Sequence, residues 1–163
     1  MRILLLSLWS VFSIGLHAAQ AESDLLTDLR TNVRAVFEDE AVLQRLQARV
    51  AGADASADPL LSGYKGILLM AEGKHRSNPF SRFGPFNEGK ALLDGAIVAA
   101  PASVELRFLR LSVQTNVPGI LRYGANKAED RAFIEAHLYE VKNEQLRRRI
   151  IDFIARAAVE GRL

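Results

Sequence analysis

Cysteine is absent from all 163 residues of this chain. Disulfides are therefore excluded, and so is attachment to a membrane through a lipidated cysteine, so the folded chain must be stabilised by packing. Beyond residue 21, no apolar stretch is long enough to cross a bilayer. We therefore expect no transmembrane segment in the mature protein.

Recognisable catalytic motifs are missing as well. The chain has no Gly-x-Ser-x-Gly turn, no phosphate-binding P-loop and no His-Glu-x-x-His pair. His75 and His137 are the only histidines after residue 21, and zinc needs three or four ligands. His137 and Glu140 are one helical turn apart, but two ligands are too few for a metal site. We expect a protein that is not an enzyme and holds no metal or other cofactor.

The chain also has no large excess of charge of one sign. Its 21 basic residues include Arg2, which leaves 20 basic residues against 19 acidic ones in the rest of the chain. A near-neutral chain lacks the electrostatic footprint of a nucleic-acid-binding protein. We therefore expect no nucleic-acid partner.

The first residues of the chain are typical of an N-terminal leader. Arg2 supplies a positive charge, residues 3–16 form an uncharged apolar stretch, and Ala19-Gln20-Ala21 is a small-x-small cleavage site. These features predict a secretory signal peptide over residues 1–21, cleaved near Ala21, and an exported mature chain. In a bacterium its destination is the periplasm or the medium. An uncleaved N-terminal anchor is the alternative interpretation of the same segment.

Residues 22–163 are typical of an all-α protein. Apolar residues recur every three or four positions, and β-alternation is absent. We expect one domain with six or seven helices arranged as antiparallel hairpins. Gly63, Gly66 and Gly73 fall inside the third helix, where each glycine costs about 1 kcal/mol of helix propensity. Their presence predicts close approach to a neighbouring helix.

The helix predicted over residues 103–113 is apolar on two opposite sides. One side carries Val104, Phe108 and Leu111, and the other carries Leu106, Leu109 and Val113. A helix with two apolar sides must be packed on both, so we expect this helix inside a stack of helices.

Residues 85–116 resemble a tetratricopeptide repeat. The pattern Ala91-x-x-x-Gly95-Ala96-Ile97-x-x-x-Pro101 is similar to the second helix of such a repeat, and the helix from Ser103 would then open the next repeat. The Trp-x-x-Leu-Gly-x-x-Tyr signature is missing. The resemblance implies a right-handed, tetratricopeptide-like stack with its core at about residues 60–116.

A second resemblance is to a group of exported bacterial proteins of unknown function. It is carried by Gly63-Tyr64-Lys65, Asn78-Pro79, Phe86-Asn87-x-Gly89-Lys90, Arg107-Phe108-Leu109-Arg110, Gln114-x-Asn116-x-Pro118, Leu121, Tyr123 and Glu129-Asp130. This resemblance implies a shared fold and no particular activity.

The best candidate binding site is a polar ribbon on the helix from Ser103, together with the segment that follows it. Its residues are Arg107, Arg110, Gln114, Asn116, Arg122 and Tyr123. Two guanidiniums one turn apart can hold a carboxylate or a phosphate. The alternative is that the arginines pair with acidic residues of the chain and join adjacent helices; the candidates are Glu88, Asp94, Glu129 and Asp130.

A second candidate is the loop around residues 74–86, which mixes basic and aromatic residues. If exposed, it can hold an anionic partner, membrane headgroups or a protein. The preferred interpretation is that Phe80 and Phe83 fold back and cap a helix pair, because aromatic residues dominate cores.

These patterns together predict a non-enzymatic, exported interaction protein that binds a protein or peptide beside the Arg107 and Arg110 ribbon. The alternative is a helical carrier or sensor for an anionic small molecule or a lipid headgroup.

Overall fold

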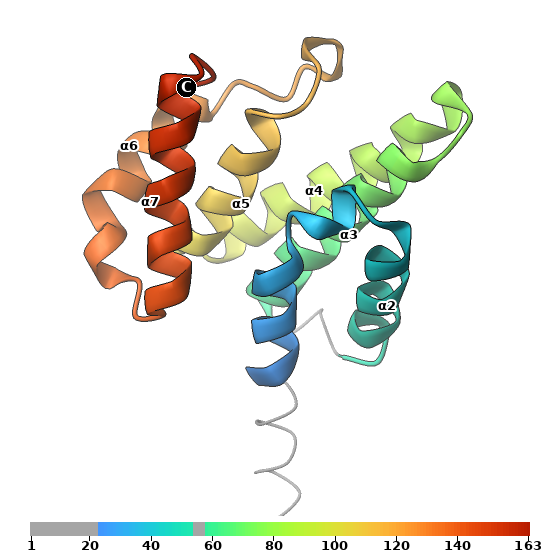
Figure 1. Cartoon of the computed structure of the whole chain (residues 1–163), viewed down its shortest axis with the longest axis horizontal. Coiled ribbons are helices and arrows are strands. Elements are labelled where there is room, and N and C mark those ends of the chain that lie inside the picture. Colours follow the sequence, from blue (N-terminus) through green and yellow to red (C-terminus); the bar gives the residue numbers. More distant parts are fainter. Residues whose placement is uncertain (1–22, 54–57) are drawn as a thin grey trace, which may run out of the picture.

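The computed structural model describes residues 23–53 and 58–163, and these residues form helices joined by short connections, with no strand among them. The predicted all-α fold is confirmed, whereas the predicted leader lies outside the described residues. The elements are a helix over residues 23–32, η1 (Ala35–Phe37), α2 (Glu40–Ala51), α3 (Pro59–His75), η2 (Pro79–Arg82), α4 (Phe83–Ala99), α5 (Val104–Gln114), η3 (Gly119–Leu121), α6 (Lys127–His137), η4 (Leu138–Glu140) and α7 (Glu144–Val159) (Figure 1). No helix in the described part of the chain is long and apolar enough to cross a membrane.

Helices α3 and α4 lie side by side and run in opposite directions (Figure 1). Their backbones meet at Gly66 and Gly89, where an added Cβ on either glycine would lie 2.5 Å or less from the other's carbonyl oxygen. Gly66, one of the glycines predicted to allow close helix contact, therefore does so.

Helix α5 separates two apolar clusters, as its two apolar sides predicted. Leu106, Leu109 and Val113 belong to a cluster with α2, α3 and α4, and Phe108 and Leu111 belong to a second cluster with α6 and α7. Figure 1 shows α5 between the α3–α4 pair and the α6–α7 pair. The polar side chains of α5 therefore lie in two narrow ribbons along the helix, one on each side between the two apolar clusters.

Side-chain caps fix where α5 and α7 begin. Ser103 accepts a hydrogen bond from the Leu106 amide at 3.3 Å, and Asn143 accepts one from the Leu146 amide at 2.9 Å. Asn126 precedes α6 but makes no cap hydrogen bond, because its backbone has ψ 6° and not the extended conformation of a capping residue.

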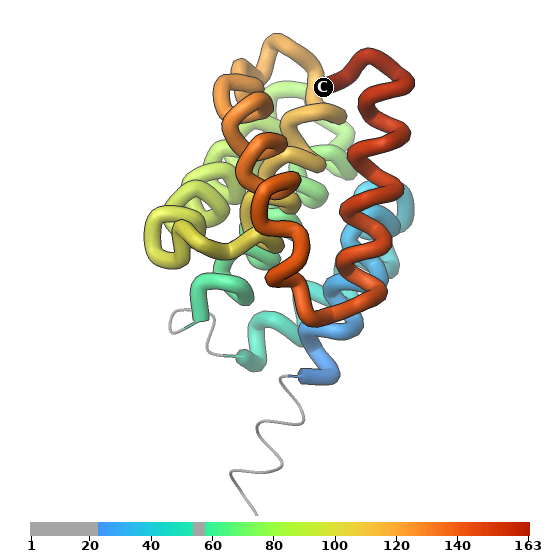
Figure 2. The backbone as a smooth tube through the Cα atoms, turned by 90° about the vertical axis from the view of Figure 1, so that its left-hand side faces the viewer, coloured from blue at the N-terminus to red at the C-terminus, as the bar shows by residue number. Residues whose placement is uncertain are grey.

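The N-terminal helix lies beside α7 (Figure 2). Figure 2 shows it (blue) beside α7 (red), and the Arg149 side chain of α7 donates a hydrogen bond to the Arg30 carbonyl oxygen. The first and last described helices are therefore in contact.

The preferred interpretation of the aromatic loop is wrong, because neither Phe80 nor Phe83 is buried. Phe80 is 86% exposed and Phe83 is 43% exposed at the turn between α3 and α4. Phe86 instead turns inward and meets Tyr123 edge-to-face, with ring centroids 6.0 Å apart.

Candidate functional site

The two arginines of the predicted ribbon share one buried carboxylate. Asp130, at the start of α6, has no exposed surface and lies against Arg110 with both oxygens, each 2.7 Å from a guanidinium nitrogen. Arg107 contacts the same carboxylate at 3.0 Å and also reaches Glu129 at 2.9 Å. This is the arrangement that the sequence left open as the alternative, in which the arginines join α5 to α6.

A second carboxylate extends the cluster toward α4. Asp94 lies 3.3 Å from Arg110 and accepts a hydrogen bond of 3.0 Å from the Tyr123 hydroxyl. Burial, together with the negative charge of Asp94, raises the pKa of Tyr123 far above its ordinary value. The hydrogen bonds that Arg110 donates to Asp130 raise the pKa of Arg110 above its ordinary value, although the partial burial of Arg110 opposes this. The cluster is charge-compensated within the chain.

The other predicted site residues lie apart from that shared carboxylate. Asn116 accepts a hydrogen bond of 2.7 Å from Arg162 near the end of the chain, and Arg122 is exposed at a left-handed turn with φ 47°. Gln114 is only 2% exposed, and neither atom of its amide has a hydrogen-bond partner among the described residues. Of the six predicted residues, the structure brings three together through carboxylates: Arg107, Arg110 and Tyr123.

The opposite ribbon of α5 carries a second network, which the sequence analysis missed. Glu105 accepts two hydrogen bonds of 2.8 Å from Arg30 and a third of 2.7 Å from the Tyr64 hydroxyl. Burial and the Glu105 charge raise the pKa of Tyr64 well above its ordinary value. The signal available in the sequence was Glu105 itself, a charged residue in a helix with two apolar sides. Its partners are 75 and 41 positions away, too far for local spacing to reveal them.

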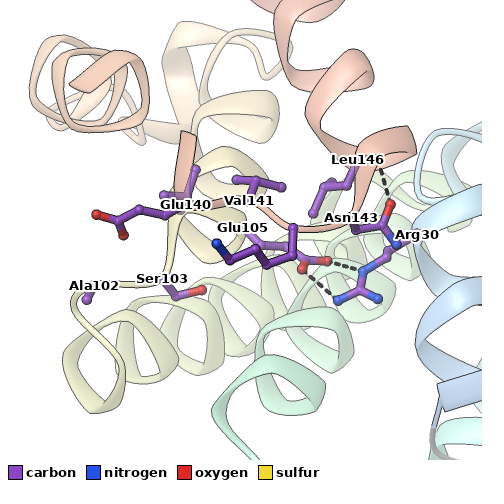
Figure 3. A pocket seen from close by; sticks show the side chains of 10 residues that line it. Arg30, Ala102, Ser103, Glu105, Glu140, Val141, Asn143 and Leu146 are labelled. Carbon is purple, nitrogen blue, oxygen red and sulfur yellow. Dashed lines mark hydrogen bonds and ion pairs between the residues drawn. The ribbon is translucent and has the colours of Figure 1, made fainter. Parts of the chain in front are cut away.

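An open pocket of about 380 Å³ lies over this second network. Figure 3 shows Arg30 and Glu105 paired within it, with Glu140, Val141 and Leu146 on other sides. Its remaining lining residues are Ala102, Ser103, Val104, Lys142 and Asn143. Because Ser103 and Asn143 are the capping residues of α5 and α7, both helices begin at this pocket.

The pocket combines two kinds of contact. Its charged groups include both signs, since Arg30 and Lys142 stand with Glu105 and Glu140, and its apolar surface comes from Val104, Val141 and Leu146. Lys142 and Glu140 are exposed at its border, whereas Glu105 is engaged with Arg30. Such a surface can accept the backbone and one or two side chains of an extended segment.

The carboxylates of the two networks contact arginine or tyrosine side chains. Within the described residues, no cluster of three or more histidine, aspartate or glutamate side chains could hold a metal ion. His137 lies stacked on Phe133 with ring centroids 4.1 Å apart, and its Nδ1 is 2.8 Å from the Phe133 carbonyl oxygen.

No protein-family model matches this chain, and no curated protein or solved structure matches it either.

Proposed function

We propose that this chain is a non-enzymatic, exported interaction protein that binds a short segment of a protein or peptide partner. The observation that supports this function best is the open pocket where α5 and α7 begin. Its mixed charges and apolar surface suit a peptide, which presents polar backbone groups and side chains of several kinds together. We further propose that the helices stack in the tetratricopeptide-like manner that the sequence resemblance implies.

The pocket is a better place for the partner than the predicted groove beside Arg107 and Arg110. Both guanidiniums already contact Asp130, so a ligand carboxylate would have to displace a fully buried one. Leaving Asp130 buried without its partners would cost several kcal/mol. The same argument weighs against the alternative function, a carrier or sensor of an anionic small molecule or lipid headgroup held by these arginines.

The proposal is tested by affinity capture from a periplasmic extract with residues 22–163 as bait, followed by binding measurements with the purified partner. Lys142→Glu reverses a charge at the border of the pocket, where the lysine is exposed. Lys65→Glu makes the same change on an exposed position of α3 and serves as the matched control. We expect a partner that wild type and Lys65→Glu retain and that Lys142→Glu loses.

Two outcomes would contradict this assignment. A partner that Lys142→Glu retains but a folded Arg110→Ala variant loses would place the binding groove beside the ribbon. Failure of wild-type protein to retain any partner beyond the background of an unrelated helical bait would contradict the interaction function itself. Circular dichroism and thermal melts show which variants remain folded.

A further inference from the structure

The turn between α3 and α4, which we call the tip (residues 74–86), stands at the opposite end of α4 from the pocket (Figure 1). α4 has 17 residues, so the two features are about 25 Å apart along its axis. The tip projects from the molecule in Figure 1 as the free end of the α3–α4 pair. Its surface is therefore available whether or not the pocket is occupied.

The tip holds Phe80 outward by its own hydrogen bonds. The Asn78 side chain accepts a hydrogen bond of 2.9 Å from the Phe80 amide. The Ser81 hydroxyl donates a hydrogen bond of 2.8 Å to the Asn78 carbonyl oxygen. Arg82 then donates through Nε at 2.8 Å to the Arg76 carbonyl oxygen and closes the turn. The 86% exposure of Phe80 thus follows from an ordered turn.

The charge at the tip has one sign. Lys74, Arg76 and Arg82 are exposed, and no acidic residue occurs between residues 74 and 87. Arg76 is paired with Glu72 at 2.5 Å, so Lys74 and Arg82 carry the uncompensated charge beside Phe80. A convex surface with an aromatic side chain at its end and cations around it complements a negatively charged, deformable surface.

We propose that the tip docks on an anionic phospholipid bilayer, with Phe80 entering the headgroup region and Lys74 and Arg82 contacting lipid phosphates. A bilayer accepts a convex projection, whereas a protein partner needs a larger complementary surface. Aromatic rings are favoured at membrane interfaces, and each basic residue near an anionic surface strengthens binding about fivefold. With few contacts, the docking is reversible, and it leaves the pocket about 25 Å from the tip along α4.

The first test is sedimentation of residues 22–163, which contain both apolar clusters, with vesicles of phosphatidylglycerol and phosphatidylcholine, compared with phosphatidylcholine alone. We expect binding to the anionic vesicles only. Lys74→Gln should weaken it about fivefold, and Phe80→Ala about tenfold. The matched controls are Lys65→Gln, which removes a charge elsewhere on α3, and Tyr139→Ala, which removes a ring that is 73% exposed beside Glu140. Both controls should bind as wild type does.

The second test reports on insertion directly. The single tryptophan of the chain is Trp9, so residues 22–163 contain none, and Phe80→Trp introduces one reporter. Its fluorescence should shift to the blue with anionic vesicles and be quenched by brominated lipid, whereas Tyr139→Trp should show neither change.

The proposal is overturned if wild-type protein does not bind anionic vesicles, or if it binds neutral vesicles equally well. It is also overturned if Phe80→Ala and Lys74→Gln bind as wild type does. Loss of a protein partner with Phe80→Ala, without any vesicle binding, would make the tip a protein contact instead. None of these results depends on whether the pocket binds a peptide.

Discussion

The same substitution at two positions of α4 should change stability in opposite directions. Gly89 faces α3, where an added Cβ would lie 2.3 Å from the Gly66 carbonyl oxygen and 2.9 Å from Cγ of Met70. Gly95 is exposed on the same helix, and an added Cβ there meets nothing within 4 Å. Gly89→Ala and Gly95→Ala therefore share the chemistry and the secondary structure and differ only in the neighbouring atoms.

The magnitudes follow from these distances. Alanine improves helix propensity by about 1 kcal/mol at both positions. At position 89 the obstacle is backbone, so the two helices must separate by on the order of 1 Å, at an overpacking cost of about 3 kcal/mol. We expect Gly89→Ala to lower the free energy of unfolding by about 2 kcal/mol and Gly95→Ala to raise it by about 1 kcal/mol, from the same propensity gain.

Urea denaturation followed by far-ultraviolet circular dichroism measures both changes as shifts in midpoint at constant slope. Thermal melts should show Tm changes of about 3 °C per kcal/mol for a chain of this size. If Gly89→Ala stabilised the protein as much as Gly95→Ala does, the close packing of α3 on α4 would be wrong. A change in the slope would mean that the variant alters the compactness of one of the two states.

Three further predictions concern the polar groups around α5. Asp130→Asn should lower the free energy of unfolding by about 3–5 kcal/mol, because it removes the buried charge that compensates two arginines. Glu129→Gln removes an exposed carboxylate that contacts Arg107, and it should leave Tm nearly unchanged. The pKa values of Tyr64 and Tyr123 are raised in the folded state, so the unfolded chain loses its tyrosine protons first, near pH 10. The contribution of these two tyrosines to stability should therefore be constant below about pH 10 and fall above it, and Tyr123→Phe should make the fall shallower in melts above pH 10. Gln114→Met should raise the free energy of unfolding by about 1 kcal/mol, since it removes a buried amide without a hydrogen-bond partner in the described structure. A lower Tm would show that the amide is hydrogen-bonded in solution.

The features of the fold that sequence could predict are those with a local cause. The two apolar sides of α5 follow from 3.6-residue periodicity alone, and the structure places Leu106 and Phe108 in different clusters. Ser103 was recognisable as the start of a helix because a capping side chain acts within three residues. The glycines of α3 predicted a close neighbour, although not which helix it would be.

Contacts between segments far apart in the sequence have no such local cause, and they could not be predicted. The sequence showed that Arg110 needs an anionic partner but offered several, and only the packing of α6 on α5 selects Asp130. The Arg30 and Tyr64 contacts with Glu105 were missed for the same reason. Phe80 was misassigned because composition favours a buried ring, whereas the hydrogen bonds of the turn hold it outside.

The two polar ribbons of α5 explain why both proposed binding surfaces, the pocket and the tip, lie where helices begin or end. Each ribbon contains a charged side chain that is satisfied from another helix, Arg110 by Asp130 of α6 and Glu105 by Arg30 of the N-terminal helix. Because a buried ion pair tolerates little displacement, each pair fixes one neighbouring helix against α5. A ligand that competed for these charged groups would weaken the packing of the neighbouring helices on α5. A partner that binds exposed groups at the helix ends leaves these ion pairs intact. Lys142 at the pocket and Phe80 at the tip are such groups.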